Sequence, residues 1–127
     1  MLLTVESKRS VEEISELMPE ACTKHGFGVL GVHDLRAKLR EKGQEFDRAV
    51  LVFDVCNPVK AKQVLTAAPT VSSVLPCRIS VYEEGGGSRI VTVQPSQMMA
   101  MFDTPELAGV AQEVEETLRA ILGELEE

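Results

Sequence analysis

Hydrophobic residues near the N-terminus first form a strand-like run and then follow a helical repeat. Residues 2–5 are a short apolar segment, which predicts a strand. Ser10 and Glu13 have the spacing of a capping box, which marks the start of a helix. Pro19 lacks a backbone donor, so we expect a kink or a break inside this helix. Its apolar residues recur at helical spacing: Val11, Ile14, Leu17, Met18, Ala21 and Cys22.

Further apolar stretches have the composition of strands. Residues 27–35 are rich in Val, Leu and Gly, whereas residues 36–43 are a charged stretch that ends in a turn. Residues 49–56 are almost continuously apolar, which predicts a central strand covered on at least one face. Residues 75–84 and 88–94 flank three glycines, which accept the positive φ angles of a hairpin. We therefore expect these last two strands to pair antiparallel.

Two prolines mark the starts of the remaining helices. Asn57 and Pro58 have the order of a helix cap and a first helical residue, and this short helix should end before Pro69. Thr104 and Pro105 repeat the pattern at the start of a C-terminal helix, which packs on the sheet or on a partner. The apolar stripe of that helix is Leu107, Val110, Val114, Leu118, Ile121, Leu122 and Leu125. The predicted order is β-α-β-β-(short α)-β-β-α, an α+β fold.

Length and composition predict one soluble domain over residues 1–127. The chain has 127 residues, of which 44% are hydrophobic and 26% charged, and these are ordinary values for a single globular domain. The apolar runs are too short for a bilayer and the N-terminus lacks a signal-peptide pattern, so we expect no membrane association and a cytoplasmic location. The net charge of -7 repels phosphate backbones, so we expect no nucleic-acid partner.

The cysteines are the most informative candidates for chemistry. Their number, three, is odd in a chain large enough to fold without disulfides, which favours free thiols in a reducing compartment. Cys56 ends a predicted strand before the Asn57 cap, where helix N-terminal amides favour a thiolate. Cys77 begins another strand after Pro76, and the two thiols meet only if these strands are antiparallel neighbours. Burial as small hydrophobic residues is the alternative for both, and we expect Cys22 only to pack.

Other patterns point to structural roles. His25 and His33 lack a helical metal-ligand spacing, and adjacent residues of a strand such as His33 and Asp34 face opposite sides, so no acid-base pair is expected. The three glycines precede a strand rather than a helix, which excludes a typical phosphate-binding loop. We expect no metal, no cofactor and no built-in catalytic signature. Three methionines should fill gaps rather than bind copper: Met98, Met99 and Met101.

Several short motifs are typical of one known family. They are Cys56-Asn57-Pro58, Ala61, Leu65, Leu75-Pro76-Cys77 and Tyr82-Glu83, together with residues 26–30 and a strand ending near Pro95 and Met98. On these residues the chain resembles, over nearly its whole length, the bacterial and archaeal family called domain of unknown function 302. Pro19 and Arg78 depart from the commoner pattern of that family.

The resemblance implies a fold and an assembly but no reaction. The implied fold is similar in outline to the TATA-binding-protein superfamily, with a mostly antiparallel sheet covered by a long C-terminal helix. It does not imply DNA binding, because that fold hosts unrelated functions and this chain is acidic. The resemblance also implies a homodimer. An antiparallel arrangement would bring Cys56 and Cys77 to one end of the sheet, near the Asn57 cap.

Three hypotheses about function follow. The first is a non-enzymatic dimeric binding module, in which Cys56, Asn57, Pro58, Cys77 and Arg78 form a pocket for a small molecule or anion at a helix N-terminus. The second is thiol-dependent redox or sulfur transfer, with Cys56 as a nucleophile of low pKa and Cys77 as the resolving thiol. The third is a purely structural protein that uses the stripe of the C-terminal helix as an interface.

Overall fold

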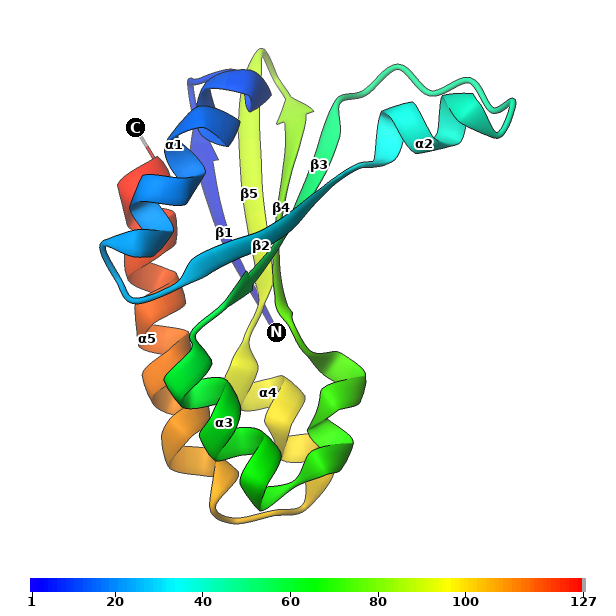
Figure 1. Ribbon diagram of the computed structural model, residues 1–127. Helices are drawn as coiled ribbons and strands as arrows, with labels where there is room; N and C mark the ends of the chain where they lie inside the picture. Colours follow the sequence, from blue (N-terminus) through cyan, green and yellow to red (C-terminus); the bar gives the residue numbers. More distant parts are fainter. Residues whose placement is uncertain (127) are drawn as a thin grey trace.

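The computed structural model, which describes residues 1–126, has a five-stranded sheet at its centre (Figure 1). The strands are β1 (Leu2–Ser7), β2 (Gly28–Asp34), β3 (Val50–Cys56), β4 (Cys77–Glu84) and β5 (Gly87–Val93). They lie in the order β1-β5-β4-β3-β2, and each neighbouring pair is antiparallel. The predicted α+β class, the antiparallel sheet and the glycine hairpin are confirmed.

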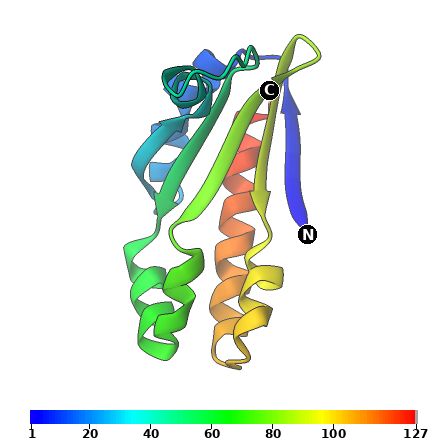
Figure 2. The ribbon, with the colours of Figure 1, turned by 90° about the vertical axis from the view of Figure 1, so that its right-hand side faces the viewer.

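Two long helices cover one face of the sheet. They are α1 (Val11–Thr23) and α5 (Leu107–Leu125). Figure 2 shows the strands in front of α5, so the opposite face of the sheet carries no helical layer. The remaining helices are α2 (Leu35–Glu41), α3 (Pro58–Ala67), α4 (Pro95–Met99) and two short 3₁₀ segments, η1 (Pro69–Val74) and η2 (Ala100–Phe102). Within residues 1–126, no helix combines the length and the apolar character needed to cross a membrane.

Local signals fix the start of α1, and its course differs from the expectation. Ser10 Oγ accepts a hydrogen bond from the Glu13 N–H at 3.1 Å, and the Ser10 N–H donates to Glu13 Oε1 at 3.0 Å, which completes the predicted capping box. Of the kink or break expected at Pro19, the break does not occur, since the helix continues to Thr23. Pro19 is exposed, so water can satisfy the carbonyl group that its missing N–H leaves without a partner.

The short helices and the start of α5 also differ from the prediction. The charged residues 36–43 largely form α2, which Asp34 caps by accepting a hydrogen bond from the Ala37 N–H at 2.9 Å. Helix α4 is a second element absent from the predicted order. Thr104 does not cap α5, because its hydroxyl donates to the Phe102 carbonyl at 3.1 Å and the helix begins at Leu107.

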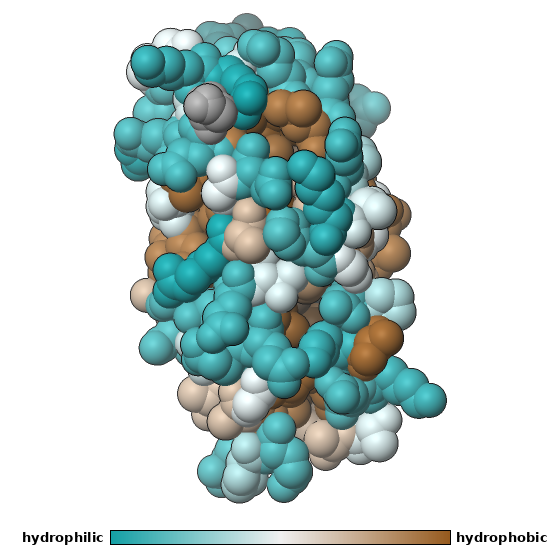
Figure 3. Space-filling view, turned by 90° about the vertical axis from the view of Figure 1, so that its left-hand side faces the viewer, coloured by the Kyte–Doolittle hydropathy of each residue, from teal (hydrophilic) through white to brown (hydrophobic). Residues whose placement is uncertain are grey.

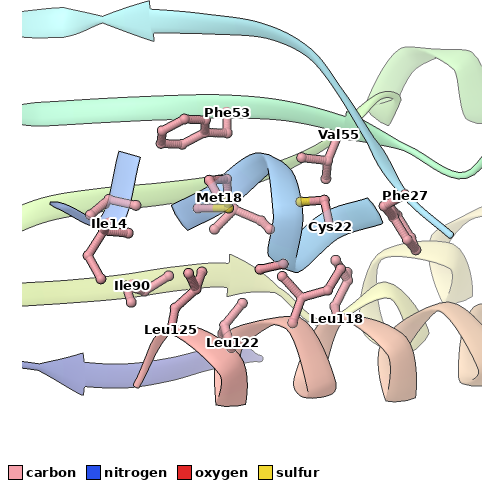
Figure 4. Packing of buried hydrophobic residues seen from close by; sticks show 14 of the residues in the cluster. Ile14, Met18, Cys22, Phe27, Phe53, Val55, Ile90, Leu118, Leu122 and Leu125 are labelled. Carbon is pink, nitrogen blue, oxygen red and sulfur yellow. The ribbon is translucent and has the colours of Figure 1, made fainter. Parts of the chain in front are cut away.

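The hydrophobic core consists of two clusters that share α5. The first, which we call the sheet cluster, packs α1 and the C-terminal half of α5 on the sheet (Figure 4). The second, which we call the helical cluster, joins α3, η1, α4 and the start of α5: Val64, Ala68, Val71, Met99, Leu107 and Ala111. Val110 packs against both clusters. The apolar stripe of α5 is therefore buried inside the chain, as the alternative of packing on the sheet predicted.

One buried carboxylate connects α5 to α4. Glu115 is only 5% exposed, and its Oε1 accepts hydrogen bonds from the Ser96 N–H at 3.1 Å and the Ser96 hydroxyl at 2.5 Å. Its Oε2 lies 3.5 Å from Nη2 of Arg119. The Ser96 hydroxyl is the main cause that lowers the pKa of Glu115 below its usual value, and burial opposes this shift. The ionised carboxylate thus takes the place of a side-chain N-cap at the start of α4.

We expect Glu115→Gln to lower the free energy of unfolding at neutral pH by about 1–3 kcal/mol, because it removes hydrogen bonds to a charged group. The folded-state pKa lies below the unfolded-state value, so this contribution is complete above the unfolded pKa and disappears as the pH falls through the folded pKa. Urea unfolding at neutral and at acidic pH measures both effects.

The exposed neighbour Glu116 provides a matched control. Glu116→Gln should change the free energy of unfolding by no more than about 0.5 kcal/mol. The assignment would be wrong if both variants lost the same stability, or if the deficit of Glu115→Gln stayed constant in acid.

Candidate ligand-binding site

A pocket of about 250 Å³ lies where one end of the sheet meets the short helices. Its walls come from both hydrophobic clusters: Val55 and Val114 belong to the sheet cluster, whereas Val64 and Met99 belong to the helical cluster. The pocket is therefore a gap in the packing between two parts of the core. Most of the lining side chains are apolar, which makes the gap suitable for an apolar group.

Strand pairing brings the two predicted cysteines to this pocket. Val55 of β3 pairs with Cys77 of β4, so Cys56 is the next residue beyond that pair, and both cysteines line the pocket. This arrangement meets the condition that their strands are antiparallel neighbours. Both cysteines are free thiols, as is Cys22, which is fully buried in the sheet cluster. The packing role expected for Cys22 is confirmed.

The environment of the pocket opposes ionisation of both thiols. Burial, and then the charge of Cys56, raises the pKa of Cys77 to about 11. Burial also raises the pKa of Cys56, which is opposite to the expected effect of a helix N-terminus. The amides of α3 do not offset this burial at Cys56, because Asn57 Oδ1 already accepts the hydrogen bond of the Lys60 N–H at 3.1 Å. Cys56 precedes that cap and lies outside the first turn of α3.

Asn57 holds the start of α3 in place, as its motif predicted. It is the N-cap residue of this helix, and Pro58 follows in the first turn. Asn57 also lies beside the turn that ends α1, where a Cβ added to Gly26 would come within 3.6 Å of Asn57 Nδ2. Gly26 has a φ of 79°, as expected for a left-handed helix stop. Asn57 lines the pocket, whereas Pro58 is exposed and lies outside the lining.

Arg78 lies on a different surface from the pocket. Its Nε is 3.2 Å from Asp54 Oδ1, and the other Asp54 oxygen is 2.7 Å from His33 Nε2. Arg78 pairs across the sheet with Asp54, on the face that α1 and α5 leave uncovered. The predicted site residues therefore divide into a pocket group, Cys56, Asn57 and Cys77, and two that lie outside it, Pro58 and Arg78.

Sequence reasoning missed the cation of this pocket. Lys60 lines it, and its ammonium group pairs with Glu113 of α5. The only sequence signal for Lys60 was its position in the first turn after Asn57. Among the methionines, Met99 is buried and lines the pocket, whereas Met101 is 68% exposed. Within residues 1–126, no cluster of three or more His, Cys, Asp or Glu side chains could hold a metal ion.

The apolar stripe of α5 does not offer the interface that the third hypothesis requires. Leu118, Ile121, Leu122 and Leu125 are at most 1% exposed, and three of them point toward α1 and the sheet in Figure 4. Figure 3 shows the outer surface on this side of the molecule, where hydrophilic side chains cover much of the helices. Using this stripe as a subunit interface would require α5 to leave its own core.

Comparisons with known proteins agree with the fold and the motifs. The family model described as domain of unknown function DUF302 matches residues 3–125. A crystal structure of an uncharacterized conserved DUF302 protein from Bacillus stearothermophilus is 32% identical to this chain, with a TM-score of 0.92. The similarity covers 99% of this chain and 98% of that one. No curated protein matches the sequence. The chain therefore belongs to the DUF302 family, as its motifs indicated.

Proposed function

We propose that this protein is a non-enzymatic, dimeric binding module that holds a small apolar molecule in the pocket beside Cys56 and Cys77. The observation that carries the proposal is the gap of about 250 Å³ between the two hydrophobic clusters. Its walls include Phe27, Val64 and Leu75, and this apolar lining gives a ligand a favourable transfer out of water. The size suits a molecule of one or two rings or a short alkyl chain.

The single cation among the described lining residues suggests an acidic end group on this ligand. Lys60 has a side chain that is 24% exposed, and it already pairs with Glu113. A ligand carboxylate beside Lys60 would gain a charge-assisted hydrogen bond while its apolar part occupies the pocket. A small inorganic anion fits less well, because the apolar walls would not replace the water around its charge. Lys60 is therefore the cation of the proposed site, whereas Arg78, which we expected there, lies outside the pocket.

Thiol exchange is the second candidate function, and the shared position of Cys56 and Cys77 favours it. In this reaction a small disulfide oxidises the two thiols: one intramolecular S–S bond forms, and the reagent leaves as two thiols that carry the protons. The raised pKa values of both cysteines weigh against this candidate, because the thiolate is the reactive form. Three free thiols also support the proposed cytoplasmic location, where reducing conditions preserve them.

We expect the wild-type protein to bind 1-naphthylamine, a neutral fluorescent probe of two rings, and its sulfonated analogue. Ala61 lines the pocket and Ala67, on the same helix, does not, so the two alanines form a matched pair. Ala61→Phe should fill the pocket and raise the dissociation constant of the neutral probe by about tenfold or more, whereas Ala67→Phe should leave it unchanged. Fluorescence titration measures both constants.

Lys60→Met tests the acidic end group separately. It should weaken binding of the sulfonated probe and leave the neutral probe unaffected, because it removes the charge but keeps an apolar chain of similar length. Absence of probe binding by the wild type, or equal weakening by Ala61→Phe and Ala67→Phe, would contradict the binding function.

We expect Cys77 to react with iodoacetamide at mildly alkaline pH on the order of 100-fold more slowly than free cysteine, because a pKa of about 11 leaves little thiolate. Mass spectrometry of timed, quenched samples gives the rate for each cysteine. Alkylation of Cys56 and Cys77 at the rate of free cysteine would contradict this expectation. It would make thiol exchange, and not ligand binding, the favoured function.

A further inference from the structure

The uncovered face of the sheet has an apolar centre. Alternate residues of β3 enter the sheet cluster, so Val50 and Val52 point to the other face. Val52 pairs with Ser80 of β4, and Ser80 pairs with Val91 of β5, which extends this face across three strands. An antiparallel sheet with one face in water normally presents polar residues there. The valines on both faces of β3 are typical of a strand that is covered on both sides.

Helix α2 projects from the same side and contacts its own chain mainly at β3 and Asp47. None of its seven residues, all described, is buried. Figure 1 shows α2 extending away from α1 and α5, and that side faces the viewer in Figure 2. Leu35, Leu39 and Phe46, in α2 and the loop after it, are each 37% exposed. Because a helix of this length is marginal in water without tertiary packing, a surface that covers the exposed parts of Leu35 and Leu39 would stabilise it further.

Charge indicates that this surface belongs to a second copy of the chain. Residues 35–42 contain four basic side chains and one acidic, whereas the whole chain has 13 basic and 20 acidic residues. The projecting α2 segment is thus a positive region on an acidic protein. Such a region is attracted to another copy of the same molecule, whose remaining surface is negative.

The available area is also of the right order. Five strands spaced at about 4.8 Å and roughly seven residues long at about 3.4 Å each give a face of about 570 Å² in outline. A stable interface buries about 800 Å² on each partner. The sheet face alone is smaller than this, and α2 with its loop supplies further apolar and charged surface beside it.

We propose that a second copy of this chain packs on the uncovered face of the sheet, with α2 of each copy reaching over its partner. This inference names the interface of the dimer proposed above. It places Val52 and Val91 at the centre and Leu39 at the periphery. The interface is independent of the pocket's ligand, because none of these three residues lines the pocket.

Light scattering coupled to size exclusion tests the interface. The wild type should elute with twice the chain mass of 13.9 kDa, and Val52→Glu or Val91→Glu should shift it to the monomer. Val59→Glu is the matched control, because Val59 is 66% exposed on α3 and outside this face. That variant should remain dimeric. Circular dichroism verifies that each variant keeps the wild-type secondary structure.

Leu39→Glu keeps the test informative if the sheet variants do not fold, because Leu39 is exposed and outside the core. It should raise the dimer dissociation constant by about tenfold or more. A monomeric wild type would overturn the proposed interface. So would fully dimeric Val52→Glu and Leu39→Glu variants. Titration of the wild type with 1-naphthylamine separates the two proposals: a monomeric wild type that binds the probe refutes only the interface, and a dimeric wild type that does not bind it refutes only the binding function.

Discussion

Helix α5 divides its apolar face between two cores, and the positions of the other elements follow from this division. The C-terminal half of α5 packs on α1 and the sheet, and its N-terminal half packs on α3, η1 and α4. The two groups of partners do not pack completely against each other. The chain leaves the sheet at the end of β3, forms α3 and η1 beyond it, and re-enters the sheet at the same end to form β4. The pocket is the space left between them. Glu115, on the same helix, secures α4 to one of its walls.

This geometry also determines the chemistry of the pocket. The return of β4 beside β3 places Cys56 and Cys77 at one end of the sheet, where both line the pocket. Close packing around the same end removes water from them, and their pKa values rise. An apolar, desolvated site suits the binding of an apolar group better than it suits a thiolate nucleophile. Lys60 supplies the charge that the walls otherwise lack.

The sequence predicted those features that depend on local chemistry. The Ser10 capping box, the Asn57 cap and the hairpin glycines all act within a few residues, and the structure confirms each one. It did not predict α2, which has no buried residue and whose only large apolar residues at helical spacing are Leu35 and Leu39. The pairing of Asp54 with His33 and Arg78 depends on strand register, which no single segment encodes. The outline similarity to the TATA-binding-protein superfamily stays a prediction.

The space between the two clusters is an apolar pocket that a ligand can enter. A crystal of the protein equilibrated under xenon pressure tests this most directly, since xenon binds in apolar cavities and leaves a strong electron-density peak. We expect a xenon peak between Val64 and Val114, beside Cys77. Helix α3 packed directly against Val55 and Val114, with no xenon between them, would contradict it.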